Sequence, residues 1–428
     1  MMTKKRLGIL WMAGLVFGFA PLSAWSAEIS FKSDTLLRVF ERDTIGEDDA
    51  AVIPAYEYLQ IDVETPDEPG LAFHLYGWVR DDFADNDYYE DNTAGELLYG
   101  YLEYTAEQAR FNTRLGRQLV FEGVANEAVD GLRVSSDLGK YFSGSVYAGQ
   151  PAALDSEQGR DGDSIYGGRL ANHVAGRYEV GLSYKKIRND SDDAEEMAGI
   201  DLSAYLPYDI NLYGFSAYNV DSEDFGEHSY QLSADIGSLS IRPYFQNFQY
   251  EDYFGTGANS ANPFRFLADT GEEMTIVGVD LTHPVGDAWT LVGKAKHYDY
   301  DVFDDSSQYY AAQAIWSGEG HSQVGGEFGY MKGDVAQNDY YLIRLDSYWD
   351  QLPDGCPMDF VSGDVVYVDY DKAIYGEDSS LFVSLGFGSK FMEDALTLKL
   401  SGDYSSDPYF DDDLRGMLTA SYRFGRSL

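Results

Sequence analysis

The charged residues that could act together in this sequence gather in one short stretch. Arg110, Asn112 and Arg114 alternate with Phe111 and Thr113, so on a strand they share one face. Such a face, turned toward a water-filled space, would present two fixed cations and an amide to passing solutes. These residue types therefore indicate the sorting of ions or a polar wall.

A second group of charges follows directly. The stretch from Leu115 to Gln118 is predicted to end one strand, and Val129 is predicted to begin the next. This places Arg117, Asp130 and Arg133 around the same turn. Charges of both signs across a narrow lumen create a transverse field that orders water and sorts ions. The alternative is that these arginines pair with acidic residues of adjacent strands and satisfy a polar wall, which is the commoner use of such residues.

Other inward-facing candidates are scattered along the chain. Each lies on the polar face of an alternating segment and is interpreted by itself as solvated wall: Arg80, Arg242, Lys294, Lys296, Glu327, Arg344, Lys399 and Asp403. One long segment, Asn259–Glu273, is a candidate for an inward-folded constriction, with an ordinary outer loop as the alternative.

The elements that must position these residues are predicted strands. Leu71, Phe73 and Leu75 fall on one face while His74 and Tyr76 fall on the other, which is a period of two. The same alternation recurs in residues 110–115, 178–185, 230–236, 323–330 and 396–401. In each segment the second face holds charges or amides, which a dry core excludes and a wet lumen accepts.

The last strand supports the same architecture. Leu418, Ala420, Tyr422 and Phe424 form an apolar face, and the opposite face is mostly polar. A C-terminal strand that ends in an aromatic resembles the closing strand of bacterial outer-membrane barrels, although Gly425–Leu428 follows the aromatic here. We expect this strand to pair with the first one, because an open sheet edge in lipid would leave backbone groups unpaired.

Residues 1–27 are predicted to be a secretory signal peptide, and residues 28–428 a single transmembrane domain. Lys4, Lys5 and Arg6 give a basic start, Leu7–Leu22 is apolar, and small residues follow. The alternative is a retained membrane anchor, which would need a longer apolar run than this one.

Composition excludes several classes of protein. Without the leader the chain keeps 27 of its 30 basic residues against 73 acidic ones, a formal charge of −46, which excludes nucleic acid as a partner. The 35 tyrosines, 24 phenylalanines and 44 glycines are numerous. Yet no apolar run after the leader approaches ~18 residues, which excludes a helical membrane protein. This combination fits a transmembrane β-barrel with aromatic girdles. The single Cys356 forms no internal disulfide.

Turn signals divide the chain into short and long connections. The predicted periplasmic turns are Leu206–Asp209, Ile236–Leu239 and Phe391–Asp394, and the predicted extracellular loops are Glu251–Glu273 and Tyr348–Gly363. Acidic runs are interpreted as further loops: Asp81–Asp82, Asp85–Asp87, Asp190–Glu196, Asp221–Asp224, Asp301–Asp305 and Asp411–Asp413. At roughly 20–22 residues per strand, the sequence predicts an all-β, antiparallel, up-and-down transmembrane barrel of about 18 strands, within a range of ~16–20.

The stretch from Leu115 resembles a family of proteobacterial porin-like channels. Leu115-Gly116-Arg117-Gln118 at a strand end, followed by Asp130-Gly131 at a strand start, is similar to alginate-export porins and to the barrel partners of multihaem cytochromes in metal-respiring bacteria. The resemblance implies an outer-membrane channel or a barrel that sheathes a cytochrome. The alginate-export type has an arginine-rich, anion-conducting lumen, from which the acid excess of this sequence departs.

Motifs of enzymes and cofactor sites are missing from the sequence. It has no Cys-x-x-Cys-His, no His-Glu-x-x-His, no Gly-x-Ser-x-Gly and no phosphate-binding glycine loop, and its six histidines are scattered. We therefore expect no enzyme activity, no cofactor and no metal. The alternative, a barrel enzyme, would need Ser or Asp and His brought together from separate strands.

The sequence thus predicts a passive outer-membrane channel for small hydrophilic solutes or ions, in contact with outer-membrane lipid and lipopolysaccharide. Acidic vestibules concentrate cations, so a modest cation preference is expected. The alternative is a structural sheath around a multihaem cytochrome. That role requires a lumen wide enough for a haem chain, and about 18 strands only just suffices. Monomer and trimer fit the sequence equally well.

Overall fold

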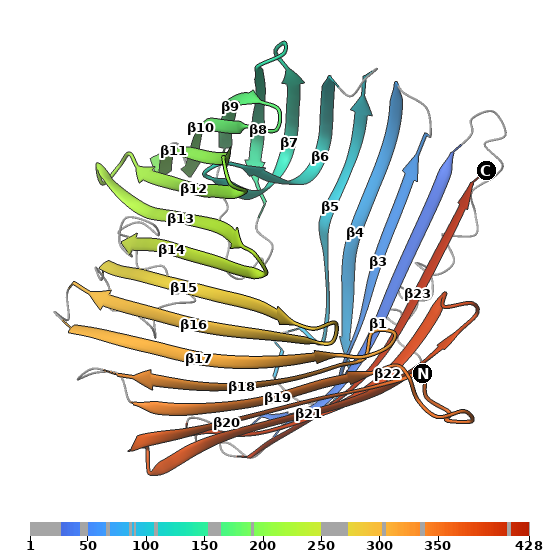
Figure 1. The fold of residues 1–428 in the computed structure, drawn as a ribbon. Coiled ribbons are helices and arrows are strands. Elements are labelled where there is room, and N and C mark those ends of the chain that lie inside the picture. The colour runs from blue at the N-terminus through green and yellow to red at the C-terminus, as the bar shows by residue number, and fades with distance from the viewer. Residues whose placement is uncertain are drawn as a thin grey trace, which may run out of the picture.

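The computed structural model describes residues 27–42, 50–65, 69–84, 88–89, 91–106, 110–152, 164–189, 192–249, 273–301, 305–333, 339–408 and 412–427. All of the long regular elements in these ranges are strands (Figure 1). Among the described residues, no helix has the length and apolar character needed to cross a membrane. The predicted signal peptide lies outside the described residues except for Ala27.

The strands follow one another along the chain. Their bounds are β1 Glu28–Arg42, β2 Ala50–Val52, β3 Pro54–Glu64, β4 Gly70–Asp82, β5 Thr93–Thr105, β6 Phe111–Glu122, β7 Ala125–Asp137, β8 Phe142–Pro151, β9 Ser164–Val174, β10 Tyr178–Asn189, β11 Asp192–Leu206, β12 Ile210–Asn219, β13 Asp224–Ile236, β14 Leu239–Gln249, β15 Glu273–Val285, β16 Trp289–Tyr300, β17 Asp305–Ser317, β18 Gln323–Lys332, β19 Tyr340–Trp349, β20 Phe360–Ile374, β21 Glu377–Phe391, β22 Leu396–Ser406 and β23 Asp413–Ser427.

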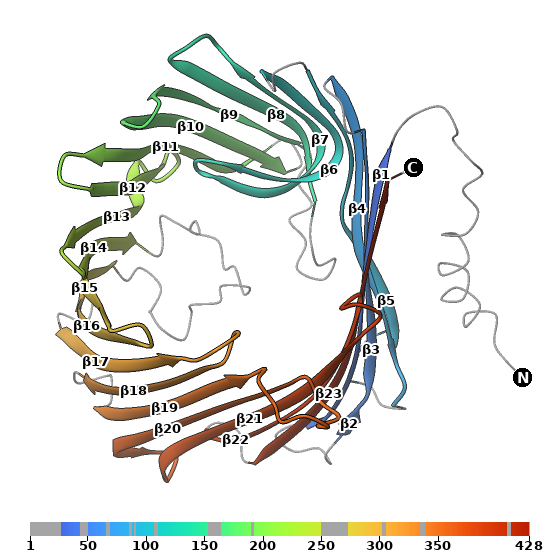
Figure 2. The same ribbon diagram turned by 45° about the vertical axis from the view of Figure 1, so that its right-hand side comes forward.

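These strands form one closed antiparallel sheet. Each pairs with its neighbour in the chain, and β23 pairs with β1, with Phe424 opposite Phe31. The predicted pairing of the last strand with the first is therefore confirmed. The short β2 continues β3 in the same register against β1. Counted as one strand, the two make the barrel 22-stranded within the described residues. Figure 2 shows the ring of strands around its interior.

The predicted fold class is confirmed, but the predicted count of about 18 strands is wrong. Apart from β2, the described strands are only 10 to 15 residues long. Many are joined by very short turns, such as Gly237–Ser238 between β13 and β14. Each strand with its connection therefore uses fewer residues than the assumed 20–22, so the chain forms more strands than predicted.

The two faces of the sheet differ sharply in character. Large apolar side chains stand exposed at alternate positions on the outside, for example Leu115 and Leu182 at 59% exposure and Leu385 at 61%. Exposing such side chains to water would be unfavourable, whereas lipid solvates them. The opposite positions carry charged, amide and phenol groups. This pattern, on a closed sheet without free edges, defines a transmembrane barrel.

The connections at the two ends of the barrel also differ. Both described chain ends lie at the same end as three tight turns, at residues 207–209, 237–238 and 392–395, which confirms the three predicted turns. Tyr208 and Met392 take positive φ angles of 68° and 56° there. The acid-rich connections lie at the opposite end. The segment from Tyr348 to Gly363 was expected among them, and this was wrong. It joins β19 to β20 on the side of the chain ends, and its outer residues belong to those strands.

Two acidic runs predicted as loops are parts of strands. Asp81 and Asp82 end β4, and Asp192–Glu196 lies within β11, because strand ends extend beyond the membrane and tolerate charge there. Residues 221–223 do form a turn. Residues 85–87, 190–191, 302–304, 411 and most of Glu251–Glu273, including most of the proposed constriction Asn259–Glu273, lie outside the described residues.

Candidate functional site

The β6–β7 hairpin leaves the barrel wall and enters the interior. The β5–β6 ladder ends where Gly100 pairs with Arg117, whereas the β6–β7 ladder continues to the turn at residues 123–124. Beyond Arg117 the hairpin curves away from β5 and lies inside the ring of strands (Figure 2). The expected boundaries, with a strand end at Gln118 and a new strand at Val129, are therefore wrong: both strands run on past these residues.

A row of glycines allows this bend. Gly116, Gly131 and Gly149 stand opposite one another on β6, β7 and β8. A Cβ atom on Gly131 would lie 2.2 Å from the Ala148 carbonyl oxygen, and one on Gly149 would lie 2.3 Å from the Asp130 carbonyl oxygen. Gly116 has a φ of 128°, which side chains rarely allow. Only glycine therefore lets the three backbones approach at this crease.

Polar contacts hold the hairpin tip against the inner wall. The backbone N–H of Val124 donates to the Ser183 hydroxyl at 3.1 Å. The Lys185 ammonium lies 2.8 Å from a Glu127 oxygen and 2.5 Å from a Glu195 oxygen, and its side chain is only 5% exposed. Ser183 and Lys185 are on the face of β10 opposite the exposed Leu182, so the tip crosses the inner side of the sheet.

A small apolar core lies beneath the hairpin. Its members come from five strands that curl around one another: Val120, Ala125, Val129, Tyr147, Ile165 and Ile187. All are at most 3% exposed. This part of the interior is therefore packed solid, and any path for solutes runs beside the hairpin.

A polar cavity of about 200 Å³ lies at the base of the hairpin. Arg133 donates from Nε to Glu122 at 2.7 Å, and the Ser145 hydroxyl donates to the other Glu122 oxygen at 2.6 Å. On the far side, Arg169 bonds Asp201 through Nε at 2.9 Å. The remaining lining residues are Ser135, Ser136, Asp137, Ser143 and Gly144.

The first predicted group of charges lies partly on the inner wall. Arg114 pairs with Glu103 at 2.8 Å, and Asn112 donates to the same carboxylate at 2.7 Å. The Arg114 guanidinium also lies over the Tyr101 ring, 5.2 Å from its centre. Arg110 is exposed in the turn that precedes β6. It therefore lies at the end of the barrel that holds the chain termini, and not in the wall.

The pair Arg117–Asp130 lies elsewhere than predicted. Two parallel hydrogen bonds of 2.8 Å join the guanidinium to the carboxylate, and Arg117 also donates to the Leu97 carbonyl at 3.0 Å. By register this pair shares the face of Leu115 and Leu132, which is the outer face before the crease. It lies in the middle of a ladder and not around a turn, because the hairpin continues beyond it.

The remaining candidates lie on the opposite part of the inner wall. Lys294 contacts Glu327 at 2.9 Å, and the Tyr309 hydroxyl donates to the same carboxylate at 3.0 Å. Arg344 makes a two-bond pair with Asp364 at 3.1 and 2.6 Å. By register, the inner face also carries Lys296 and Lys399, which have no ion pair among the described residues. The candidate cations that have ion pairs have the arrangement of a polar wall: Arg114, Arg117, Arg133, Lys294 and Arg344.

Sequence reasoning missed two features of this wall. The carboxylate partners Glu103, Glu122 and Asp201 lie on other strands than their arginines, and only the register brings them together. The second feature is a strip of aromatic side chains on β3, β4 and β5, which pairs of aromatics two residues apart in the sequence could have indicated. Among the described residues no group of three or more potential metal ligands occurs.

Comparison with known proteins finds similar chains among solved structures. No family model matches the chain, and no curated protein does. The chain is similar in overall structure to the translocation pore of the P pilus usher PapC, with a TM-score of 0.48 and 10% identity over 94% of this chain and 100% of that one. It is also similar to OccAB4 of Acinetobacter baumannii, with a TM-score of 0.46 and 12% identity over 95% of this chain and 100% of that one. A further similar structure is the outer membrane protein OpdK of Pseudomonas aeruginosa, with a TM-score of 0.45 and 10% identity over 94% of this chain and 99% of that one.

Proposed function

We propose that the protein is an outer-membrane channel for the passive diffusion of small hydrophilic solutes or ions. The observation that carries this proposal is the inner wall: a closed barrel with an apolar outside turns ion pairs such as Arg114–Glu103 and Lys294–Glu327 toward its interior. A wall of satisfied charges is compatible with water and with polar solutes in transit.

We propose a modest preference for cations. Arg114, Lys294 and Arg344 of the wall are paired and attract anions only weakly, although Lys296 and Lys399 have no ion pair among the described residues. Acidic residues crowd the far end of the barrel, including Asp81, Asp221, Glu223 and Asp301. With the chain at a formal charge of −46 without its leader, this mouth concentrates cations. The reversal potential in a salt gradient tests this: a potential of the sign expected for anion flow contradicts it.

A second candidate is a sheath around an electron-carrying multihaem cytochrome. The width of the barrel favours it, because barrels of 16–18 strands hold aqueous channels whereas 22-stranded ones hold a plug. Some filling beyond the hairpin is therefore expected. A co-purifying haem protein, combined with silence of the empty barrel in bilayers, would support this candidate over the channel.

The test that separates the two candidates uses the refolded chain without its leader. Inserted in a planar bilayer, a channel gives stable stepwise currents without any partner. A matched control is the same preparation left unfolded, which excludes detergent leaks. A well-folded barrel that stays silent contradicts the channel proposal.

A further inference from the structure

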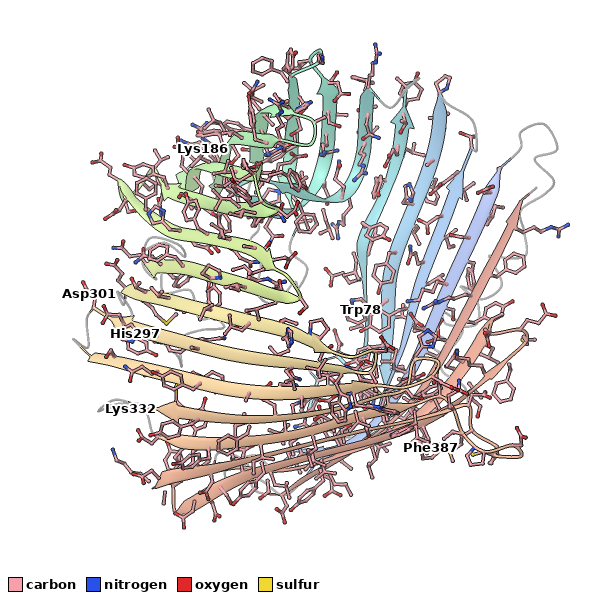
Figure 3. All side chains as sticks on the ribbon, in the orientation of Figure 1. Trp78, Lys186, His297, Asp301, Lys332 and Phe387 are labelled. Carbon is pink, nitrogen blue, oxygen red and sulfur yellow. The ribbon has the colours of Figure 1, made fainter. Side chains whose placement is uncertain are left out.

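The inner face of β3, β4 and β5 carries a continuous row of aromatic rings, here called the aromatic strip. Its members are Tyr56, Tyr58, Tyr76, Trp78, Tyr99 and Tyr101. Neighbouring ring centres lie close together: 6.0 Å for Tyr56–Trp78, 6.4 Å for Tyr58–Tyr76, 5.5 Å for Tyr76–Tyr99 and 5.8 Å for Tyr99–Tyr101. Trp78 is labelled on β4 in Figure 3.

The strip faces the lumen and not the lipid. On β4 its members share the face of His74, while Leu71 and Phe73 on the other face are 47% and 37% exposed. All six rings are half-buried. Aromatic residues of membrane barrels ordinarily stand outside, at the two interfaces, where lipid headgroups solvate them.

Sheet stability alone does not account for this placement. Cross-strand aromatic pairs do stabilise sheets, and each contact here contributes to the wall. The same pairs would do so on the lipid side without leaving apolar ring faces in contact with water. A row of rings in a wet lumen therefore indicates a ligand that covers them.

Polar groups beside the rings narrow the chemistry of this ligand. At one end of the strip the Asp62 carboxylate binds Gln60 at 2.9 Å and His74 at 2.7 Å, and Glu103 lies beyond it. In the part of the chain that the structure describes, the Tyr56 hydroxyl bonds that of Tyr89 at 3.1 Å, whereas the hydroxyls of Tyr58, Tyr76 and Tyr99 have no hydrogen-bond partner. Ring faces, carboxylates and free phenols together suit a solute with flat C–H faces and a rim of hydroxyl groups.

We propose that the aromatic strip is a binding track for cyclic polyols, that is, for sugars in the pyranose form. Their C–H faces stack on the rings, and their hydroxyls bond to the phenols and to Asp62. The Asp62 carboxylate disfavours anionic aromatic solutes at its part of the strip, whereas at Glu103 the Arg114 guanidinium, which also lies over Tyr101, offsets the acidic charge. This inference rests on the proposed channel function, because the track gives a permeating solute its path.

The test measures binding of maltohexaose to the detergent-solubilised barrel by calorimetry, and block of its ionic current in a bilayer. The variant Tyr58→Leu/Tyr76→Leu/Tyr99→Leu should bind maltohexaose at least about tenfold more weakly, since it removes three stacking surfaces. The matched control is Tyr340→Leu/Tyr370→Leu, which removes an aromatic pair 6.4 Å apart on β19 and β20. This control should bind as the unchanged barrel does.

The outcomes separate this inference from the channel proposal. A barrel that conducts ions but binds no maltohexaose, or whose leucine variant binds equally well, overturns the track and leaves the channel. A barrel that binds the sugar at the strip but never conducts supports the track and contradicts the channel. Polyethylene glycol of similar size tests for simple obstruction: equal block by both solutes also overturns the track.

Discussion

Lys185 joins the hairpin tip to the inner wall through a buried ion pair. Its ammonium lies between the Glu127 and Glu195 carboxylates in a nearly dry place. Breaking a buried pair on one side leaves uncompensated charge, which costs about 3–5 kcal/mol. The pairing adds to the small apolar core that Val120 and Ala125 share with Ile187 of β10.

We expect Lys185→Met to release the hairpin tip while the barrel remains closed. The two carboxylates would then repel each other and draw in water. The measurement is limited proteolysis at the turn next to Val124, read by mass spectrometry. Lys390→Met, at the barrel end and exposed, is the control. Equal resistance of the unchanged protein and Lys185→Met contradicts this role.

Asp350 makes a pH-sensitive link between the β17–β18 and β19–β20 connections. Both connections lie at the end of the barrel where the chain begins and ends. Its carboxylate accepts the His321 backbone N–H at 3.0 Å and the Ser322 hydroxyl at 2.9 Å, and contacts the His321 ring. Partial burial raises the pKa of Asp350, but these hydrogen bonds outweigh it, so the pKa lies below its ordinary value.

The sign of the pH effect follows from this lowered pKa. The folded protein holds the proton less tightly than the unfolded chain, so the stabilisation is present above the ordinary carboxyl pKa of about 3.9 and disappears as the pH falls through the folded value. Hydrogen exchange of the His321 amide, corrected for its intrinsic rate, should lose protection below about pH 4. In Asp350→Asn that pH dependence should vanish. Its persistence would refute the assignment.

At the scale of elements, the crease of Gly116, Gly131 and Gly149 decides whether the hairpin can turn inward. We expect Gly131→Ala to destabilise the barrel by about 1–3 kcal/mol, because its methyl group meets the Ala148 backbone. The matched control is Gly402→Ala, where the nearest atom is 3.6 Å from the new carbon. Urea unfolding in detergent measures both. Equal midpoints for the two variants would contradict the crease.

The hairpin is also expected to limit the width of the path for ions through the barrel. Replacing Leu119–Ala128 by a short glycine linker removes the packed plug over β8 to β10 and should raise single-channel conductance severalfold. Refolding is checked by the shift in gel mobility on heating. A refolded variant with unchanged conductance means that the hairpin lies outside the path.

The elements also mark the limit of prediction from sequence. Alternation of apolar and polar residues was sufficient for the fold class, and turn-forming residues were sufficient for the tight turns. The bend was not predictable, since Gly116, Gly131 and Gly149 become a row only in the actual register. The same limit applies to ion pairs: Arg114 and Arg133 were identified, but their partners Glu103 and Glu122 depend on register and on the inward fold.

For the whole molecule, the strand count was the main error, and it has a functional consequence. The 22 strands among the described residues enclose a wider interior than 18 strands would. The protein fills part of that interior with its own hairpin and lines another part with aromatic rings. The hairpin and the rings leave the proposed channel a narrower path than 22 strands alone would enclose.

The most direct measurement is the single-channel current of the refolded barrel in a planar bilayer under a salt gradient. We predict stable steps, with a reversal potential that shows modest cation preference, because Arg114, Lys294 and Arg344 of the wall are neutralised by carboxylates and acidic residues outnumber cations at the far end of the barrel. Silence from a demonstrably folded barrel would contradict the channel itself. Anion-selective steps would contradict the account of its charges.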